Sequence, residues 1–276
     1  MKKLLLLFFF PFLLGGPDGY IIEMVSISEI GRDEYAPRKF DKGLLFSVMD
    51  KSNYSNLYYS EIIDKDKLGH LQKVKFDILN NHHIGTAEYC SASRELIFTG
   101  NNSERYKGIN RLALFRGVFT KGTVNEISKL DFCSARYNYS YPTLSENGLT
   151  LIFSSNIKDG KHLLHRSKRD SINGEWSSPE LIDELDFGTN CMFPNLINDS
   201  LLVFAANMDK YGKGGLDIYK SKYIDGHWSS PENWEELNSE YDDFGVEMMD
   251  EKSGYFTSHR NFDKDKIYYF EIPTKK

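Results

Sequence analysis

Two pairs of adjacent acidic residues, Asp33-Glu34 and Asp242-Asp243, are the carboxylates in this sequence that best suit catalysis. Glycoside hydrolysis needs two carboxyl groups that flank the sugar, about 5 to 9.5 Å apart. Each pair precedes a stretch typical of a β-strand, so each is expected in a loop that leads into a sheet. The competing interpretation is that these acids accept hydrogen bonds from loop backbone amides, as Asp often does. We favour this second interpretation.

Other polar residues precede similar strand-like stretches and form a candidate binding set. Its members are His82, His83, Arg136, Tyr139, Asn190 and Asp242. Asp242 also belongs to one of the two acidic pairs. Tyr139 alternates with Tyr137 and Tyr141, so the three side chains share one face if the segment is extended. Tyrosine suits interfaces because it combines an apolar ring with a polar tip, but packing inside the protein explains a Tyr here equally well.

Metal and cofactor chemistry have no clear signal in the sequence. The rings of adjacent His82 and His83 point to opposite faces of an extended chain, which makes joint chelation difficult. No Cys-x-x-Cys pair, Gly-x-Ser-x-Gly elbow, Walker loop or Gly-x-Gly-x-x-Gly motif is present. Residues 212–215, which are rich in glycine, are interpreted as a hairpin loop. We therefore expect no cofactor and no metal.

A repeat of about fifty residues must position these side chains. Its clearest copies are residues 141–156 and 193–207, and weaker copies lie at 37–47, 87–101 and 246–260. The Phe of the second apolar run recurs at intervals of 52, 55, 51 and 52 residues, as Phe46, Phe98, Phe153, Phe204 and Phe256. A fixed period of this length is typical of a β-propeller.

Each repeat contains four stretches that read as strands. A Pro-containing run is followed by a turn such as Asn147-Gly148, an apolar run, an aromatic run and a polar run that begins near Trp176 or Trp228. The second copy has Arg94-Glu95 at the turn, which does not readily supply the required backbone conformation. We therefore expect the second blade to be the least regular.

The number of strands predicts how the ring closes. Four full units occupy residues 35–243, and the fifth supplies three strands before the chain ends. The apolar, β-branched segment 20–25 is expected to supply the missing strand, because an open ring would leave a sheet edge exposed. The prediction is an all-β, five-bladed propeller of four-stranded antiparallel blades, with six blades as the alternative. The predicted blades are residues 35–81, 82–134, 135–189, 190–243 and 244–273 with the closing strand 20–25.

The first residues have the order of a secretory signal peptide. Lys2 and Lys3 precede the apolar run 4–14, and Gly15 and Gly16 follow it. The run is too short to cross a bilayer, which needs about 20 residues. The alternatives are an uncleaved anchor or a buried first strand. We predict a signal peptide at 1–16 and a single domain at 17–276, periplasmic or secreted, with no transmembrane segment after cleavage.

Three cysteines would then lie in an oxidising compartment. Cys133 and Cys191 fall in connections between blades, where they could approach each other, whereas Cys90 lies in an inner strand. The sequence leaves open whether the first two form a disulfide or all three are buried free thiols.

Composition supports one large domain and argues against nucleic acid as a partner. The 276 residues are 40% hydrophobic and 14% aromatic, and the net charge is −6 without a basic stripe. Runs of mixed sign, such as 64–67 and 263–266, are typical of solvated hairpin tips. We expect a monomer.

Residues 141–155 and 214–221, together with the Trp-Ser-Ser-Pro phrase at 228–231, resemble the WD-like propeller repeats of TolB and of OmpA-associated periplasmic proteins of Gram-negative bacteria. The resemblance extends from about residue 35 to 270 and is strongest in the third and fourth units. In many relatives a C-terminal OmpA-like domain binds peptidoglycan, and some serve envelope assemblies such as type IX secretion. This sequence ends after the propeller, which places direct peptidoglycan anchoring in doubt.

Two functions from different classes remain open at this point. The leading hypothesis is an exported, non-catalytic propeller that binds an envelope protein or a glycan. The alternative is a carbohydrate-active hydrolase that uses Asp33 or Glu34 with Asp242 or Asp243. Both pairs are expected on one side of the funnel, because the first and fifth blades are neighbours in the ring. Fold does not separate the two functions, because propellers carry out both.

Overall fold

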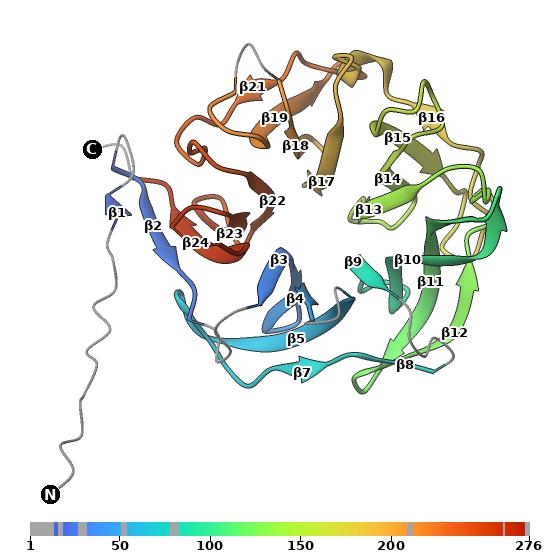
Figure 1. The fold of residues 1–276 in the computed structure, drawn as a ribbon, viewed down its shortest axis with the longest axis horizontal. Helices are drawn as coiled ribbons and strands as arrows, with labels where there is room; N and C mark the ends of the chain where they lie inside the picture. The colour runs from blue at the N-terminus through green and yellow to red at the C-terminus, as the bar shows by residue number, and fades with distance from the viewer. Residues whose placement is uncertain are drawn as a thin grey trace, which may run out of the picture.

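Five β-sheets surround a central axis in this chain, as a computed structural model shows (Figure 1). The structure describes residues 14–15, 19–26, 32–50, 54–77, 83–208, 212–261 and 263–273. Each sheet is one blade, and the inner strands β3, β9, β13, β17 and β22 line the axis. The prediction of an all-β propeller with five blades is confirmed.

The third and fourth blades are built from the clearest repeats. Blade 3 contains β13 (Tyr139–Leu144), β14 (Thr150–Ser155), β15 (Leu163–Lys168) and β16 (Glu180–Leu181). Blade 4 contains β17 (Cys191–Ile197), β18 (Leu201–Ala206), β19 (Asp217–Ile224), β20 (His227–Trp228) and β21 (Glu232–Asn233). A short 3₁₀ helix, η2 (Asp183–Leu185), follows β16.

The first two blades are joined by a connection that takes part in both sheets. Blade 1 contains β3 (Asp33–Phe40), β4 (Gly43–Met49), β5 (Ser55–Asp64), β6 (Lys67–Leu68) and β7 (Gln72–Lys73). Blade 2 contains β9 (Ile84–Cys90), β10 (Glu95–Tyr106), β11 (Ile109–Thr120), β12 (Thr123–Lys129) and, from the connection, β8 (Lys75–Phe76). β8 pairs in parallel with β12, although it lies within the residues predicted for blade 1.

Blade 2 has the longest strands and the most register shifts of the five sheets. Its strands β10 and β11 are 12 residues long, and the register shifts in all three of its antiparallel pairings. Arg94, in the turn before β10, has a left-handed φ of 57°. This is the conformation that Gly, Asn or Asp would adopt at lower energetic cost, as the sequence analysis anticipated.

The ring closes between the N-terminal and C-terminal segments of the chain. Blade 5 contains β22 (Asp243–Met248), β23 (Ser253–Ser258), β24 (Lys266–Glu271), β2 (Ile21–Met24) and β1 (Leu14–Gly15). β2 pairs antiparallel with β24, with Ile22 opposite Phe270. Closure by an N-terminal strand is therefore confirmed. Residues 1–13 and 16 of the predicted signal peptide lie outside the described residues.

Four inner strands contain a bulge at the same position of the repeat. Ala36, Tyr141, Phe193 and Gly245 have left-handed φ angles of 52°, 57°, 52° and 62°, and the strand register shifts around each of them. A bulge bends its strand and redirects the next side chains. The residues that follow in each strand therefore meet at the axis, as described below.

The core lies between the blades and is built on the repeated phenylalanines. All five anchor rings are buried: Phe46, Phe98, Phe153, Phe204 and Phe256. Cys90, Cys133 and Cys191 are also buried, and none of the three forms a disulfide. Burial raises the pKa of the Cys133 and Cys191 thiols to about 12, so both remain protonated and unreactive at neutral pH. Within the described part of the chain, no helix has the length and apolar character needed to cross a membrane.

Candidate functional site

The acids of blade 1 form ion pairs at the face where the inner strands begin. Asp33 accepts a hydrogen bond from the backbone of Asp265 at 3.1 Å and pairs with Lys264 at 3.3 Å. Glu34 is buried and pairs with Lys266. Burial raises the pKa of Glu34 to about 7, despite the opposing effect of Lys266. One carboxylate oxygen of Glu34, Oε1, has no hydrogen-bond partner.

The acids of blade 5 stabilise neighbouring loops. Asp242 Oδ1 accepts a hydrogen bond from the backbone of Leu216 at 2.7 Å. Asp243 is fully buried and pairs with Arg260 at 2.5 Å. Its second oxygen accepts hydrogen bonds from the backbone and the hydroxyl of Ser239 at 2.6 and 2.7 Å. These contacts are those expected of acids that fix loops.

Asp265 connects the two acidic pairs. Burial raises the pKa of Asp265, and the charges of Asp33 and Asp242 raise it further, whereas His259 lowers it. His259 Nδ1 lies 3.2 Å from Asp265 Oδ1. Acids of the first and fifth blades therefore meet on one side of the axis, as the order of blades requires.

The candidate binding residues on this face are engaged in contacts within the protein. His83 Nδ1 accepts a hydrogen bond from the backbone of Ser55 at 3.2 Å, and Asn190 Oδ1 accepts one from His162 at 2.9 Å. Arg136 is exposed and lies over the ring of Tyr106, 5.3 Å from its centroid. His82 lies outside the described residues.

Tyr139 is buried rather than presented at the surface. Its side chain is 2% exposed, and its hydroxyl accepts a hydrogen bond from Ser134 at 3.2 Å and donates one to the Phe132 carbonyl at 3.3 Å. Its ring packs near Phe153, with centroids 6.1 Å apart. The packing interpretation of this tyrosine explains these contacts.

A ring of polar side chains crosses the axis, one from each inner strand. The five residues occupy the same position of the repeat, directly after the Pro in three blades: Arg38, Glu88, Thr143, Asn195 and Glu247. Arg38 Nε lies 3.3 Å from Glu88, and its Nη1 lies 3.9 Å from Glu247. Asn195 donates to Glu247 at 2.7 Å, and Thr143 contacts Asn195 at 3.4 Å. We refer to these five residues as the axial ring.

The axial ring contains more negative than positive charge. Arg38 is its single cation and is 2% exposed, whereas Glu88 and Glu247 both carry carboxyl groups. Burial raises the pKa of Glu88 to about 8, because the attraction of Arg38 does not offset the loss of water and the repulsion from Glu247. The pKa of Glu247 is raised as well, chiefly by burial. The pair therefore binds a proton more tightly than isolated carboxylates do.

Aromatic side chains fill the axis beside this ring. The centroids of Tyr141 and Phe193 lie 4.0 Å apart, and those of Phe193 and Phe244 lie 4.4 Å apart. Because each precedes its axial-ring residue in the strand, this aromatic layer lies toward the face where the inner strands begin. The axial acids are therefore approached from the opposite face.

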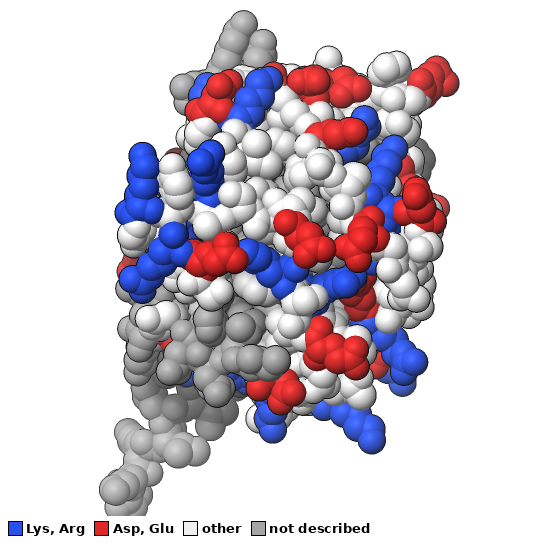
Figure 2. All heavy atoms as spheres, turned by 90° about the vertical axis from the view of Figure 1, so that its right-hand side faces the viewer, with Lys and Arg blue, Asp and Glu red and all other residues white. Residues whose placement is uncertain are grey.

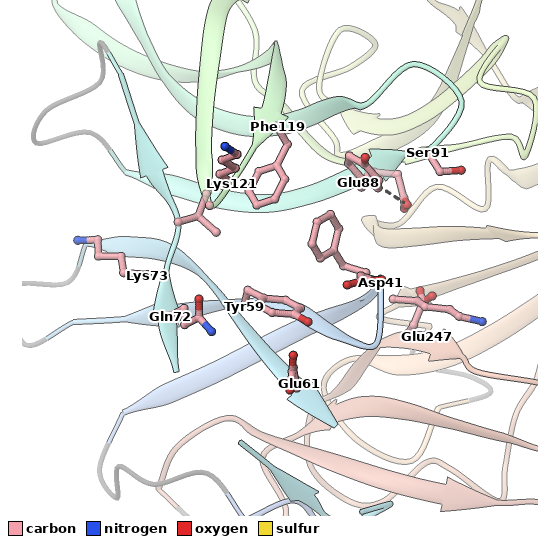
Figure 3. Close-up of a pocket in the computed structure, with 15 residues that line it drawn as sticks. Asp41, Tyr59, Glu61, Gln72, Lys73, Glu88, Ser91, Phe119, Lys121 and Glu247 are labelled. Carbon is pink, nitrogen blue, oxygen red and sulfur yellow. Dashed lines mark hydrogen bonds between the residues drawn. The ribbon is translucent and has the colours of Figure 1, made fainter. Parts of the chain in front are cut away.

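A cleft on that opposite face reaches the axial ring. It has a volume of about 920 Å³ and lies between blades 1 and 2 (Figure 3). Glu88 and Glu247 line its inner end, and their side chains are 15% and 12% exposed. Its walls are aromatic, from Phe40, Tyr59, Tyr89 and Phe119.

Sequence reasoning did not identify the axial ring or this cleft. The signal was present in the position after the repeated Pro, which carries Thr143 and Asn195 in the clear copies and charged residues in the weaker ones. The charge imbalance becomes visible only when the five positions are compared in register.

Charges on the outer surface are mixed. On the side formed by the right-hand part of Figure 1, basic and acidic side chains alternate without a continuous patch of one sign (Figure 2). This face offers no basic stripe of the kind that nucleic acids require.

Known structures resemble this chain in fold but not in sequence. A thermostable family-43 glycoside hydrolase aligns over 92% of this chain and 93% of its own, with a TM-score of 0.61 and 11% identity. The catalytic domain of the GH62 α-L-arabinofuranosidase of Coprinopsis cinerea aligns over 90% and 94%, with a TM-score of 0.57 and 11% identity. A putative TolB from Agrobacterium tumefaciens aligns over 94% and 88%, with a TM-score of 0.52 and 12% identity.

No protein family model matches the chain, and no curated protein matches its sequence. The propeller fold is therefore shared both with TolB and with glycoside hydrolases. Identities this low establish the fold alone, and function has to be argued from the site.

Proposed function

We propose that this chain is an exported, non-catalytic β-propeller that binds a partner in the bacterial cell envelope, either a protein or a glycan. The observation that carries the proposal is the engagement of the four candidate catalytic acids. Asp33 and Asp243 have cations and backbone amides as partners, Glu34 has Lys266, and Asp242 has a backbone amide. Acids with these partners hold loops in place. The open cleft on the opposite face is then the surface available for binding a partner.

The accessibility of these acids also supports binding over catalysis. A general acid must reach the leaving group within hydrogen-bond distance, about 2.6 to 3.2 Å. Asp243 is 0% exposed and Glu34 is 1% exposed, so a substrate would reach either only after a rearrangement. The resemblance of the repeats to TolB and OmpA-associated proteins points to the same class of function.

One observation favours the hydrolase alternative. Glu34 has a pKa raised to about 7 and an oxygen without a hydrogen bond, which are properties of a general acid that works near neutral pH. Asp33 acts on Glu34, and the charges of Asp33 and Asp242 both raise the pKa of Asp265. A carboxylate pair for glycoside hydrolysis would therefore be drawn from this group.

A screen of the purified protein on a panel of glycosides separates the two functions. The variants Asp33→Asn, Glu34→Gln, Asp242→Asn and Asp243→Asn should fold, and neither they nor the parent should show turnover. Turnover in the parent that disappears in a single variant would reject the binding proposal. Glu175→Gln, at an exposed position between β15 and β16, is the matched control.

Export is tested separately on protein taken from its native envelope. Mass spectrometry should find a mature N-terminus near residues 16–20, because the segment 1–16 has the order of a signal peptide. Retention of Met1 would contradict export. Sedimentation of the same material should give the mass of a monomer.

A further inference from the structure

The cleft between blades 1 and 2 has charges of opposite sign at its two ends. In Figure 3, Glu88 and Glu247 lie at the end near the axis, and Lys73 and Lys121 lie at the other end. Lys73 comes from β7, and Lys121 from the turn between β11 and β12. The cleft thus runs from a buried acidic end to an exposed basic end.

At the inner end, the cation already present does not balance the acids. The guanidinium of Arg38 donates to three backbone carbonyls, of Pro37, Pro194 and Val246, at 3.2, 2.8 and 3.4 Å. Its single charge is shared between Glu88 and Glu247. One negative charge therefore remains uncompensated when both carboxyl groups are ionised.

Other charged groups at this end do not remove the imbalance. Lys39 is exposed and donates its ammonium hydrogen bond to the Met249 carbonyl at 3.3 Å, and Asp41 adds a further acid beside the cleft. The inner end thus combines three acids with two cations. The acids are Glu88, Glu247 and Asp41, and the cations are Arg38 and Lys39. A buried negative charge without a counter-charge is costly, and a cationic ligand group would offset that cost.

The middle of the cleft is aromatic. Phe40 makes edge contacts with Tyr59, Tyr89 and Phe119, at centroid separations of 5.4, 4.7 and 4.9 Å. All four side chains are partly exposed. Aromatic walls suit the methylene stem of a basic side chain, and their ring faces attract a cation.

The outer end supplies the opposite charge. Lys73 and Lys121 are exposed, and neither forms an ion pair within the part of the chain that the structure describes. Gln72 and the backbone of Gly122 lie beside them. An acidic group of a ligand would find two ammonium groups at this end.

We propose that this cleft binds a peptide segment whose Lys or Arg side chain passes the aromatic walls to reach Glu88 and Glu247, while an acidic residue of the same segment lies against Lys73 and Lys121. The proposal rests on the proposed binding function and names the class of partner, a protein segment of alternating charge. The order of charges along the cleft fixes the direction of the segment. A uniformly basic or uniformly acidic peptide matches only one end.

The test uses three short peptides with the purified full chain. The probe is acetyl-Lys-Gly-Glu-amide, and the controls replace its Lys by norleucine or its Glu by Gln. Binding is followed by nuclear magnetic resonance as shifts of the Tyr59 and Tyr89 ring signals. Each control should bind about tenfold more weakly than the probe, because charge-assisted hydrogen bonds are lost.

Matched variants identify the ends of the site. Glu247→Gln should weaken binding of the probe about tenfold but leave binding of the norleucine peptide unchanged. Lys121→Glu should reverse the preference for an acidic residue at the third position of the peptide. Glu175→Gln, at an exposed position outside the cleft, should bind the probe as the parent does. If Glu247→Gln fails to fold, Glu88→Gln provides the same comparison.

Equal binding of the probe and the norleucine control would overturn the proposal, as would the absence of ring-signal shifts at millimolar probe.

The broader binding function has its own test. Photo-crosslinkers at position 59 and at position 136 of the opposite face would report an envelope partner. A crosslink at position 136 with no peptide binding would reject this proposal and retain the binding module.

Discussion

Two groups of acids in this propeller differ in charge balance and in burial: Glu34 and Asp243 are almost fully buried, whereas the side chains of Glu88 and Glu247 are 15% and 12% exposed. At the face where inner strands begin, Glu34 has Lys266 and Asp243 has Arg260. At the axis, Glu88 and Glu247 share the single guanidinium of Arg38. One cation for each acid makes a structural contact, whereas two acids for one cation leave a charge that a proton or a ligand can neutralise.

The difference follows from how each group is assembled. In the first group each acid is held by its own partners: Asp243 accepts from Ser239, four residues away, and Asp33 accepts from the backbone of Asp265 across the junction of blades 1 and 5. The axial ring takes one residue from each of the five inner strands, so its contacts join blades around the axis. The first group therefore stabilises blade junctions, and the second depends on the closed ring.

The largest effect should follow removal of the axial cation. Arg38→Met leaves Glu88 and Glu247 without a counter-charge, and breaking a buried pair in this way costs about 3 to 5 kcal/mol. Chemical denaturation at neutral pH would measure the loss, with Lys168→Met at an exposed position of blade 3 as the control. The loss should shrink at pH 5, where the acids take up protons. A variant as stable as the parent would show that the axial acids are uncharged.

A smaller loss is expected when the buried acid of the loop face is neutralised. Asp243→Asn keeps the shape but removes the charge that holds Arg260, at a cost of about 2 to 3 kcal/mol, the usual range for hydrogen bonds to charged groups. The same change at a solvent-exposed loop acid would cost at most about 1 kcal/mol, because water replaces its partners. Denaturant midpoints beside those of the exposed control Asp263→Asn would decide between the two values.

Stability should also fall as the pH rises from about 4.5 to 8. The pKa of Glu88 is raised to about 8 and that of Glu34 to about 7, both by burial, so the folded chain binds protons more tightly than the unfolded chain in this window. Stabilisation from these groups is complete below pH 4.5 and is lost as each ionises. We expect a loss of several kcal/mol, because each unit by which the folded pKa exceeds the unfolded pKa corresponds to about 1.4 kcal/mol.

Glutamine variants show which acid causes this pH dependence. Glu88→Gln should flatten the upper part of the melting profile, toward pH 8, and Glu34→Gln the lower part, because their pKa values differ. Unchanged profiles in both variants would assign the pH dependence to other groups.

The smallest effect should come from the exposed acid of the loop face. Asp242→Asn retains an oxygen that can accept the hydrogen bond from Leu216, so the loss should be at most about 1 kcal/mol. Thermal melting of this variant beside Asp243→Asn would show that adjacent acids differ because of burial. Equal losses would contradict that explanation.

The sequence by itself determined the repeat, the five blades and the closing strand. The repeated phenylalanines identify the core positions directly, because the same buried environment recurs in every blade. The segment 20–25 was identified as the closing strand because a ring cannot leave a sheet edge unpaired. It also determined that Asp33, Glu34, Asp242 and Asp243 would lie together, since the first and fifth blades must be neighbours.

Only the tertiary structure decided which acids are balanced and which are not. Asp243 meets its cation Arg260 within blade 5, whereas Glu88 shares Arg38 with Glu247 through contacts between blades that are far apart in the sequence. Bulges in four inner strands turn the following residue toward the axis, and the closed ring brings the five axial-ring residues within contact distance. Burial then sets their charge, because the cost of ionisation depends on how much water the surrounding blades exclude.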